Sequence, residues 1–389
     1  MRIGICSPIT ISEFLPYCDE KSRKVAAGLI GLMAPSVDAL VHRFLAIGYD
    51  VVIFTLSPEV SKSIVLTGKH LKIYIGRYRK LGILRSHTLF FSEIVMLRRF
   101  IRNEPCLDVM HAHWTYEFAI GALAAKCPVV CTIRDVAEEV LKLIPTFYRR
   151  ARKWMNDYVL RQDGVVFIAN SPYTKKRILE YHPALEIAAI IPNPCGLPVV
   201  DAVPDRSEYP LRCVSVSQGR GRLKNIDTLV GAFSRVREQY PDAELHLIGP
   251  PFRMEEWGDK PVPPGVVLCG PVPHTELGEA FRTATVMMHP SLEESFGNVL
   301  IEAMACGLPV IGGKTSGAVP YVLDYGKAGI LCDVTDENAI ASEILNLFQN
   351  PTDRYRLAVA GIERVKTTFS VVAVASQTLE LYKSVLKSI

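Results

Sequence analysis

The chain lacks several motifs that would assign it to a common class at once. It contains no Asp-x-Asp pair that could hold a divalent cation, so we expect no metal and no cofactor. Its first strand-like run leads to no Gly-x-Gly-x-x-Gly segment, which argues against a NAD-dependent dehydrogenase. The longest apolar stretch, Val25–Val37, contains glycines and a proline and is shorter than the roughly 20 residues of a membrane helix. We therefore expect no membrane span, in a protein that is cytoplasmic or bound peripherally to the cytoplasmic face of a membrane.

The chain also has little net charge and no arrangement of cysteines typical of a metal site. A formal charge of +4 is too small to indicate nucleic acid as a partner. The 10 cysteines include no two pairs at zinc-site spacing, and many lie in apolar runs, which indicates reduced core residues. With 49% hydrophobic and 22% charged residues, the composition is typical of a globular enzyme, and 389 residues favour two domains.

Short apolar runs alternate with helix-like stretches in both halves of the chain. This rhythm of strand, helix and strand indicates parallel sheets with helical crossovers. Strands are expected at 2–7, 50–55, 107–113, 128–132, 164–169, 189–192, 212–217, 243–249, 265–269 and 285–289, and helices at 37–47, 118–125, 172–181, from 226, and up to 284.

A proline-rich stretch from Pro192 to Pro210 interrupts this rhythm and is expected to link two domains. The predicted fold class is α/β, with two tandem Rossmann-like, doubly wound parallel-sheet domains over residues 1–197 and 198–370. A helix at 371–389 is expected to pack back on the N-terminal domain. Ligands of such sheets bind at the carboxyl ends of the strands, so we expect the site in a cleft between the domains.

The most informative segment runs from His289 to Gly312: His-Pro-Ser-Leu-Glu-Glu-Ser-Phe-Gly-Asn-Val-Leu-Ile-Glu-Ala-Met-Ala-Cys-Gly-Leu-Pro-Val-Ile-Gly. It predicts the end of a strand, a polar turn and a helix over 296–306. Gly307 is expected in the left-handed conformation at the end of that helix.

The start of this helix favours an anion, because its backbone N–H groups have no helical partner, and a phosphate is the natural ligand. Carboxylates on either side can bind hydroxyl groups. We assign Glu294 to a transferred sugar and Glu302 to a ribose. The plainer interpretation is that an acid in the first turns of a helix only complements the helix dipole. The backbone N–H groups that would face the phosphate at the start of this helix belong to Phe296, Gly297, Asn298 and Val299.

The whole segment, Glu-x7-Glu flanked by Pro-Ser and by Ala-Met-Ala-Cys-Gly-Leu-Pro-Val, resembles the signature of the group 1, family four retaining glycosyltransferases of the GT-B fold. The resemblance implies transfer of a sugar from a nucleotide-diphosphate sugar, with UDP- and GDP-sugars the leading candidates. It implies retention of the anomeric configuration. The acceptor stays open among a glycan or other carbohydrate, a lipid-linked acceptor and a small molecule.

Two more segments resemble the donor site of that family. The loop after the strand at 212–217 resembles the one whose arginine and lysine clamp the diphosphate, which assigns these roles to Lys224 and to either Arg220 or Arg222. The alternative for this glycine- and arginine-rich loop is a solvated turn. We expect Asn225 to cap the following helix.

The segment from Thr315 to Leu323 is similar to the glycine loop that brings backbone N–H groups to the donor, so we assign Ser316 and Gly317 to donor binding. The family usually has Pro-Glu where this chain has Pro320-Tyr321.

In the first domain, the run Asp-Val-Met-His-Ala-His-Trp ending at Trp114 resembles the motif that places a histidine near the reacting sugar. We carry this role to His113 and expect His111 to point to the opposite face of the sheet. The alternative is a core histidine.

The acceptor side departs from the family pattern. Arg134, followed by Asp135, stands where the family often has a histidine, and Ile-Pro-Asn-Pro at 191–194 replaces the common Pro-Asn-Gly. We place Arg134 and Asp135 on the acceptor side. In the long loop between Pro8 and Ser36, Gly28 or Gly31 could contact donor phosphate or acceptor.

These residues suggest a metal-independent reaction with front-face attack, in which the leaving phosphate oxygen helps to take the acceptor proton and Glu294 and His113 orient the sugar. The enzymatic alternative is a GT-B sugar-nucleotide hydrolase or epimerase. The non-enzymatic alternative is a catalytically silent GT-B scaffold, which the presence of Glu294, Glu302 and Lys224 disfavours.

Basic and apolar residues are interleaved in three segments of the first domain, at 76–85, 90–102 and 147–154. Such segments suit an anionic membrane surface, where each cation contributes about 1 kcal/mol. The competing interpretation is a solvated basic face or a guide for an anionic soluble acceptor.

Overall fold

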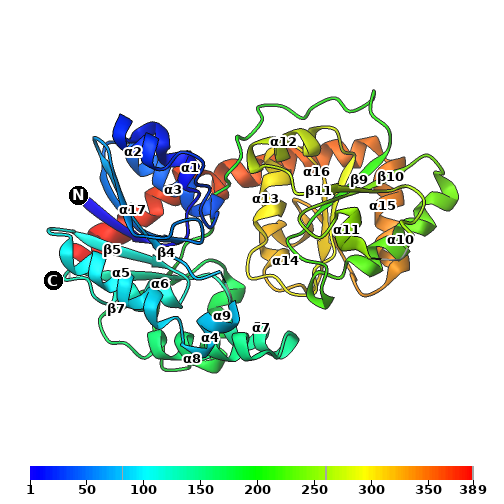
Figure 1. The fold of residues 1–389 in the computed structure, drawn as a ribbon. Helices are drawn as coiled ribbons and strands as arrows, with labels where there is room; N and C mark the ends of the chain where they lie inside the picture. Colours follow the sequence, from blue (N-terminus) through cyan, green and yellow to red (C-terminus); the bar gives the residue numbers. More distant parts are fainter. Residues whose placement is uncertain (81, 259–260, 388–389) are drawn as a thin grey trace. The chain divides into compact units, whose positions relative to one another are not determined.

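The computed structural model describes residues 1–80, 82–258 and 261–387, with the backbone alone described at 82–84. The chain forms two compact units. The first contains Met1–Pro194 and the segment that begins at Val371, and the second is Cys195–Ser370 (Figure 1). The chain thus leaves the first unit after Pro194, a little before the boundary at 197 that the sequence suggested.

The sheet of the first unit has eight strands in the order β3-β4-β2-β1-β5-β6-β7-β8, and all neighbours are parallel except β3 and β4. The strands are β1 (Arg2–Cys6), β2 (Asp50–Ser57), β3 (Ile64–Thr67), β4 (Leu71–Arg77), β5 (Val109–His113), β6 (Val129–Ile133), β7 (Val165–Ala169) and β8 (Ile187–Ile190).

The sequence pattern did not predict β3 and β4. In β4, buried Leu71, Ile73 and Ile75 alternate with the partly buried Lys72 and Tyr74, and Tyr74 packs in the core on the opposite face of the sheet. This short alternation of more and less buried residues is the sequence signal that indicates β4.

The helices of the first unit are α1 (Ile11–Phe14), α2 (Glu20–Val25), α3 (Pro35–Ala46), α4 (Gly82–His87), α5 (Phe91–Asn103), α6 (Glu117–Ala122), α7 (Ala137–Leu143), α8 (Phe147–Leu160), α9 (Pro172–Tyr181) and the C-terminal α17 (Val371–Lys387). Helix α17, red in Figure 1, packs beside α3 although the two helices lie at opposite ends of the chain.

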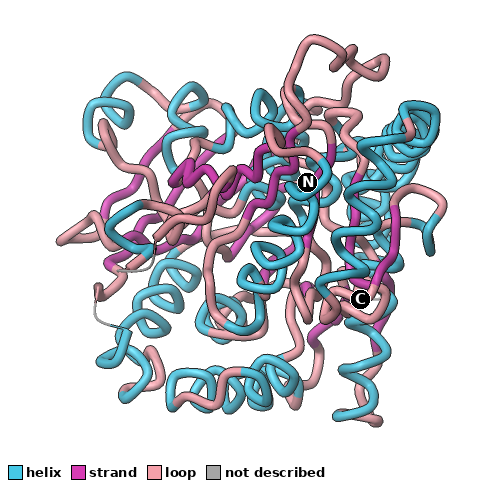
Figure 2. The backbone as a smooth tube through the Cα atoms, turned by 90° about the vertical axis from the view of Figure 1, so that its right-hand side faces the viewer, coloured by secondary structure: helices cyan, strands magenta, loops and turns pink. Residues whose placement is uncertain are grey.

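The sheet of the second unit has six parallel strands in the order β11-β10-β9-β12-β13-β14. They are β9 (Arg212–Val216), β10 (Glu244–Ile248), β11 (Val266–Gly270), β12 (Val286–His289), β13 (Val310–Gly313) and β14 (Ile330–Cys332). The helices are α10 (Ile226–Gln239), α11 (Met254–Trp257), α12 (His274–Arg282), α13 (Asn298–Ala305), α14 (Val319–Val322), α15 (Glu337–Gln349) and α16 (Pro351–Arg364), which continues into a π-helical turn, Val365–Phe369. Figure 2 shows the same backbone with helices in cyan and strands in magenta.

The central strands are apolar along their whole length because both faces of each sheet are covered. In β2, Val51 and Ile53 belong to the core beneath α3, whereas Val52 and Phe54 belong to the core on the opposite face, beneath α5. The fold class predicted from the sequence, two doubly wound parallel-sheet domains, is confirmed. None of the helices in the described ranges has both the length and the apolar character of a membrane span.

Each sheet has one point at which the strand order reverses. In the first unit, β2, β4 and β3 lie on one side of β1, and the next strand, β5, pairs with β1 on the other side. In the second unit, β10 and β11 lie on one side of β9, and β12 pairs with β9 on the other side. The loops after these strand pairs form the binding crevice of a doubly wound sheet.

Candidate functional site

Two loops of the second unit meet at its reversal point. The loop after β9 carries Lys224, at the end of a short 3-10 helix, and the loop after β12 carries Glu294. The Lys224 ammonium contacts the Glu294 carboxylate, although 70 positions separate them. The backbone N–H of Leu292 also donates to the carbonyl of Leu223 at 2.9 Å, so the two loops are joined through their main chains as well.

Glu294 is held in its charged form. Its side chain is 15% exposed, and His289 Nε2 lies 3.2 Å from Oε1. Burial alone would raise the pKa of Glu294, but Lys224 and His289 outweigh burial and hold it well below its usual range. The carboxylate is therefore ionised at neutral pH beside a cation. The sequence pattern marks His289 only as the end of a strand and does not predict this contact.

Helix α13 begins at Asn298 rather than at Phe296, because Gly297 precedes it with a φ of +89°. Phe296 is buried and packs edge-on against Phe369, with ring centroids 5.6 Å apart. The aromatic pair anchors the turn, so the first N–H groups of α13 point from a fixed position. Gly307 adopts the left-handed conformation as predicted, with a φ of +65°.

Glu302 lies in the second turn of α13 and is only 7% exposed. Its Oε1 is 2.9 Å from Nε2 of His274, the first residue of α12. No sequence pattern indicates this partner, because the two residues come from different helices. A hydroxyl ligand at Glu302 would share the carboxylate with His274.

The glycine loop is locked to the turn that carries Glu294. Gly317 has a φ of +58°, and a Cβ at this position would lie 2.2 Å from the carbonyl oxygen of Glu294. The N–H of Ala318 donates to that same carbonyl at 2.8 Å. Ser316 is fully buried beside it, and its hydroxyl has no hydrogen-bond partner among the described residues. The structure thus brings Ser316 and Gly317 next to Glu294.

The two candidate arginines differ. Arg220 donates to Asp227 at 2.9 Å and to the carbonyl of Trp257 at 3.0 Å, and its guanidinium lies 3.7 Å from the centre of the Trp257 ring. Arg222 is exposed. Arg220 is therefore part of the local packing, whereas the side chain of Arg222 is accessible.

The expectation that Asn225 caps α10 through its side chain is wrong. Asn225 occupies the capping position with a φ of +53°, and no helix N–H donates to its side chain. Instead its Oδ1 accepts from the Thr228 hydroxyl at 2.6 Å and its Nδ2 donates to the carbonyl of Val334 at 2.7 Å. The left-handed backbone turns the amide toward the segment after β14.

In the first unit, His113 ends β5 at the reversal point and is 1% exposed. The expectation that His111 points to the opposite face is wrong, because residues two apart in a strand share a face. The two rings lie 4.1 Å apart. His111 bonds to the Tyr382 hydroxyl at 2.6 Å and to the Thr132 hydroxyl at 2.7 Å, which joins β5 to α17.

The two departures from the family pattern are neighbours in space. Arg134 follows β6, and its Nη1 donates to Oδ1 of Asn193, from the Pro-Asn-Pro segment, at 2.6 Å. Its Nη2 lies 3.0 Å from Nδ1 of His113. Asp135 accepts from the Tyr116 hydroxyl at 2.9 Å, and burial raises its pKa. The structure therefore brings His113 and Arg134 together.

Gly31 lies in the loop after β1 and pairs with Thr10 in an isolated β-bridge. Its φ is +91°, and its N–H donates to a carboxylate oxygen of Glu59 at 2.9 Å. Its amide is thus already bound to the segment that follows β2, while a role in contacting a ligand stays a prediction. Gly28 also has a positive φ, +83°.

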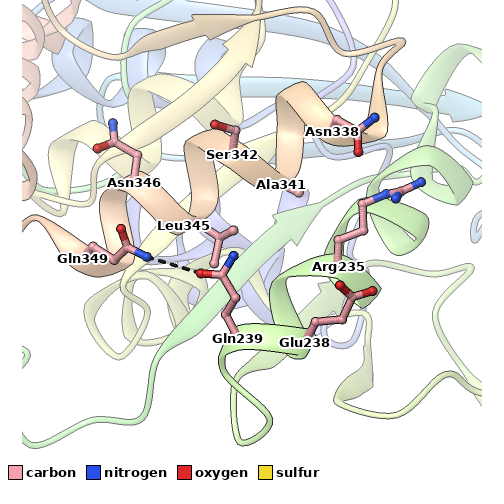
Figure 3. A pocket seen from close by; sticks show the side chains of 9 residues that line it. All are labelled: Arg235, Glu238, Gln239, Asn338, Ala341, Ser342, Leu345, Asn346 and Gln349. Atoms are coloured by element: carbon pink, nitrogen blue, oxygen red, sulfur yellow. Dashed lines mark hydrogen bonds between the residues drawn. The ribbon is translucent and has the colours of Figure 1, made fainter.

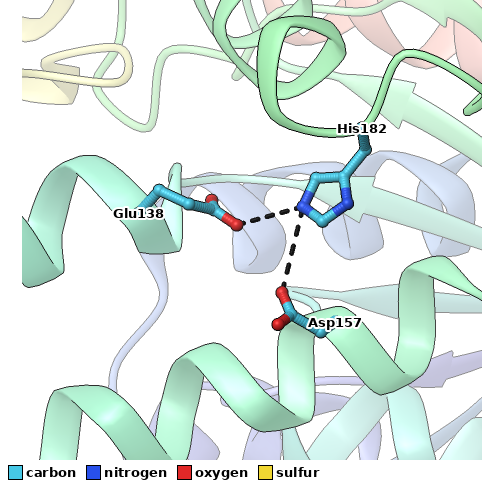
Figure 4. A group of neighbouring side chains, drawn as sticks. All are labelled: Glu138, Asp157 and His182. Atoms are coloured by element: carbon cyan, nitrogen blue, oxygen red, sulfur yellow. Dashed lines mark hydrogen bonds and ion pairs between the residues drawn. The ribbon is translucent and has the colours of Figure 1, made fainter.

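Among the described residues, one group of three side chains could offer ligand atoms to a metal ion: Glu138, Asp157 and His182, whose atoms lie within 4.8 Å of one another (Figure 4). Lys153 lies 2.6 Å from Asp157 and 3.7 Å from Glu138, so a cation of the protein already pairs with both carboxylates of this group. These residues join α7, α8 and the end of α9, and none belongs to the motifs above.

A groove of about 590 Å³ lies between α10 and α15 (Figure 3). Its polar lining includes Gln239 and Gln349, whose amides are 3.4 Å apart. None of its lining residues belongs to the loops at the reversal point.

Known proteins resemble this chain along most of its length. Residues 33–195 match Glycosyltransferase Family 4, and residues 211–350 match Glycosyl transferases group 1. A phosphatidyl-myo-inositol mannosyltransferase of Mycobacterium leprae is 30% identical over 350 residues, which cover 85% of this chain and 87% of that protein. An N-acetyl-alpha-D-glucosaminyl L-malate synthase of Bacillus anthracis is 26% identical, over 72% of this chain and 76% of that protein.

Solved structures agree on the fold. Sucrose-phosphate synthase of Thermosynechococcus elongatus superposes with a TM-score of 0.76 at 22% identity and covers all of both chains. The alpha,alpha-trehalose 6-phosphate synthase of Burkholderia multivorans gives a TM-score of 0.70 at 12% identity, over 100% of this chain and 99% of that one. At these identities the likeness concerns the fold alone. Together with the two family matches and the mannosyltransferase relative, it shows that the chain belongs to family four of the group 1 glycosyltransferases, enzymes of the GT-B fold.

Proposed function

We propose that this glycosyltransferase takes a sugar from a nucleotide-diphosphate sugar, retains its anomeric configuration and needs no metal ion. The observation that carries the proposal is the ion pair between Lys224 and Glu294 at the β9–β12 reversal point, directly before the N-terminus of α13. A cation, a carboxylate and a helix start at the crevice of a doubly wound sheet suit a diphosphate joined to a hydroxyl-bearing group.

In this proposal the leaving diphosphate binds to Lys224, to the accessible Arg222 and to the first N–H groups of α13. These groups stabilise the negative charge that develops as the bond from the sugar breaks, which is the task a metal ion performs in other enzymes. Glu302 binds the ribose, and Ser316 and Gly317 lie along the phosphates. Glu294 binds hydroxyls of the transferred sugar.

The reaction then proceeds on one face of the sugar. The bond from C1 to the phosphate oxygen breaks while the bond from C1 to the acceptor oxygen forms on the same side. The acceptor proton passes to the departing phosphate oxygen, so no base of the protein is required. Glu294 remains ionised throughout, consistent with its lowered pKa, and helps to orient the sugar and balance the positive charge that develops on it.

For the acceptor, we propose a lipid-linked or otherwise anionic molecule reached at a membrane surface. The relatives include a phosphatidyl-myo-inositol mannosyltransferase, whose name specifies such an acceptor. In this chain, α8 and the residue that caps its C-terminus expose one stripe of side chains spaced three or four residues apart: Phe147, Arg150, Trp154, Tyr158 and Arg161.

Helix α5 presents a second stripe of the same kind, made of Phe91, Val95, Arg99 and Arg102, all exposed. Aromatic rings interleaved with arginines are typical of a surface that enters the headgroup region of an anionic bilayer. The apolar residues predicted for the neighbouring segment at 76–85, namely Leu81, Ile83 and Leu84, lie outside the described side chains.

The reaction is tested by incubating the protein with UDP-, GDP-, ADP- and TDP-sugars and with three acceptors that the names of the relatives specify: phosphatidyl-myo-inositol, inositol 3-phosphate and L-malate. We expect one donor to release its nucleotide diphosphate with acceptor present, and NMR of the product to show the anomeric configuration of the donor. EDTA should leave the rate unchanged. Inverted product, or an absolute requirement for added Mn²⁺ or Mg²⁺, would overturn the corresponding part of the proposal.

Membrane docking is tested separately by co-sedimentation with vesicles. At low salt the protein should bind phosphatidylglycerol vesicles better than neutral ones, and Trp154→Ala or charge reversal at Arg98, Arg99 and Arg102 should weaken binding. Reversal of Arg356, an exposed arginine on α16 of the second unit, is the matched control. Equal binding to anionic and neutral vesicles would show that the protein does not dock on an anionic membrane surface.

A further inference from the structure

The end of β5 contains a hydrogen bond whose direction is fixed by chemistry. Nη2 of Arg134 lies 3.0 Å from Nδ1 of His113, and Nε lies 3.3 Å from the same atom. A guanidinium only donates hydrogen bonds, so Nδ1 must accept. A neutral imidazole that accepts at Nδ1 carries its proton on Nε2.

Arg134 is itself held in place from several segments of the first unit. Its Nη1 donates to Asn193 at 2.6 Å and to the Ser36 hydroxyl at 3.1 Å, and its guanidinium lies 5.2 Å from the centre of the Trp114 ring. Burial lowers the pKa of Arg134 to about 9, so it remains protonated at neutral pH. A rigid, charged donor therefore faces Nδ1.

The other nitrogen of His113 is different. Nε2 is buried and has no hydrogen-bond partner among the residues that the structure describes. His111, two residues earlier, has partners for both of its nitrogens, the hydroxyls of Tyr382 and Thr132. Since a buried donor left unpaired destabilises a protein, an N–H on Nε2 calls for an oxygen that the chain does not supply.

We propose that Arg134 is a positioning residue that fixes His113 as a neutral imidazole with its proton on Nε2, so that this N–H donates to an oxygen of the bound sugar. The identity of that oxygen rests on the proposed transferase function. The tautomer does not, and it can be measured on the free protein.

The charged and titratable groups around His113 oppose a second proton. Burial lowers its pKa well below the ordinary value, and His111 and Arg134 lower it further. Cys131, on the adjacent β6, is neutral because burial raises its pKa to about 12. His113 therefore acts as a hydrogen-bond donor and not as an acid.

The experiment is two-bond ¹H–¹⁵N NMR of the full chain labelled with [¹⁵N]histidine, with the His113 signals assigned by their loss in His113→Gln. In the wild type, His113 should show the Nε2–H tautomer and should not titrate between about pH 5 and about pH 8, where an ordinary histidine does. Arg134→Lys should keep the tautomer because the ammonium still donates. Arg134→Met should yield mixed tautomers or a histidine that titrates.

Arg23→Met, at an exposed arginine on α2 of the same unit, is the control and should leave the His113 signals unchanged. A wild-type His113 protonated on Nδ1, or doubly protonated at about pH 7, overturns the proposal whether or not the Arg134 variants fold. An unchanged tautomer in folded Arg134→Met also overturns it.

Once a donor and an acceptor are identified, Arg134→Met should lower kcat by about tenfold to a hundredfold with a smaller change in KM. Arg134→Lys should retain most of the wild-type rate. If NMR shows the expected tautomer while no nucleotide sugar is turned over, the proposed function fails and the tautomer assignment stands.

Discussion

The carboxylates of Asp38, fully buried in the first unit, and of Glu294, 15% exposed in the second, have pKa values that shift in opposite directions. Asp38, in α3, accepts hydrogen bonds from the backbone N–H and the hydroxyl of Thr10 at 3.1 and 2.6 Å. Burial outweighs these bonds and raises its pKa to about 6. At Glu294 burial acts in the same direction, but Lys224 and His289 reverse it.

The difference shows how strongly the partner's charge acts: the neutral donors at Asp38 leave burial dominant, whereas the cation at Glu294 outweighs it. Asp38 secures the loop after β1 through neutral donors. Glu294 forms part of a charged group that can exchange partners with a ligand. The same contrast separates the charged pairs of the second unit, where we place the donor, from the neutral imidazoles at the end of β5.

The largest effect is expected from removing the charged side chains that we assign to the donor site of the second unit. Lys224→Ala, Glu294→Ala and Glu302→Ala should each fold and should lower the transfer rate by on the order of tenfold to a thousandfold, because each removes a group that contacts the donor in our account. Circular dichroism checks the fold and steady-state kinetics the rate.

The matched control is Glu337→Ala, which removes an exposed ion pair with Arg235 at 3.0 Å in the same unit. Its rate should equal that of the wild type. Wild-type turnover in all three site variants would remove the donor-site assignment.

A second test concerns the backbone that carries Glu294. Gly317→Ala places a Cβ 2.2 Å from the carbonyl oxygen of Glu294 at a φ of +58°. The left-handed strain and the contact together should lower the free energy of unfolding by roughly 2–4 kcal/mol. Gly219→Ala, where a Cβ would meet nothing within 4 Å, should lower it far less in the same denaturant titration. Equal losses would mean that the glycine loop is not locked to the turn.

A third test measures how the titration of Asp38 changes the free energy of unfolding. Its folded pKa lies above the unfolded value, so protonation favours the folded state; this contribution is full below about pH 4 and is lost as pH rises through about 6. Asp38→Asn keeps the shape and does not titrate. Relative to this variant, the wild type should lose roughly 2–3 kcal/mol between about pH 4 and about pH 7. Parallel stability curves for the two proteins would show that Asp38 titrates normally.

The sequence predicted the central strands and the fold class because their apolar runs are buried on both faces and leave a strong pattern. It failed for β3 and β4, near one edge of the first sheet, because β3 has only four residues and β4 interleaves apolar residues with Lys72 and Tyr74. It also failed for α1 and α2, each of six residues or fewer, because so few turns give little periodicity.

For the candidate site, the motif placed Glu294 and Glu302 on the turn and helix after β12, but their partners came from elsewhere. His274 belongs to another helix, and Asn193 follows the last strand of its sheet, so only the fold shows that they contact Glu302 and Arg134. The Asn225 cap was misjudged because the sequence favoured an extended capping residue, whereas the loop adopts the left-handed conformation.

The central claim is that a nucleotide diphosphate binds beside Lys224 and Glu294, and calorimetric titration of UDP, GDP, ADP and TDP tests it most directly. One of these nucleotides should bind the wild type and the Glu337→Ala control with equal affinity, and Lys224→Met should weaken its binding by about tenfold or more. If no nucleotide binds the wild type, or if Lys224→Met binds as tightly as the wild type, the donor site does not lie where this account places it.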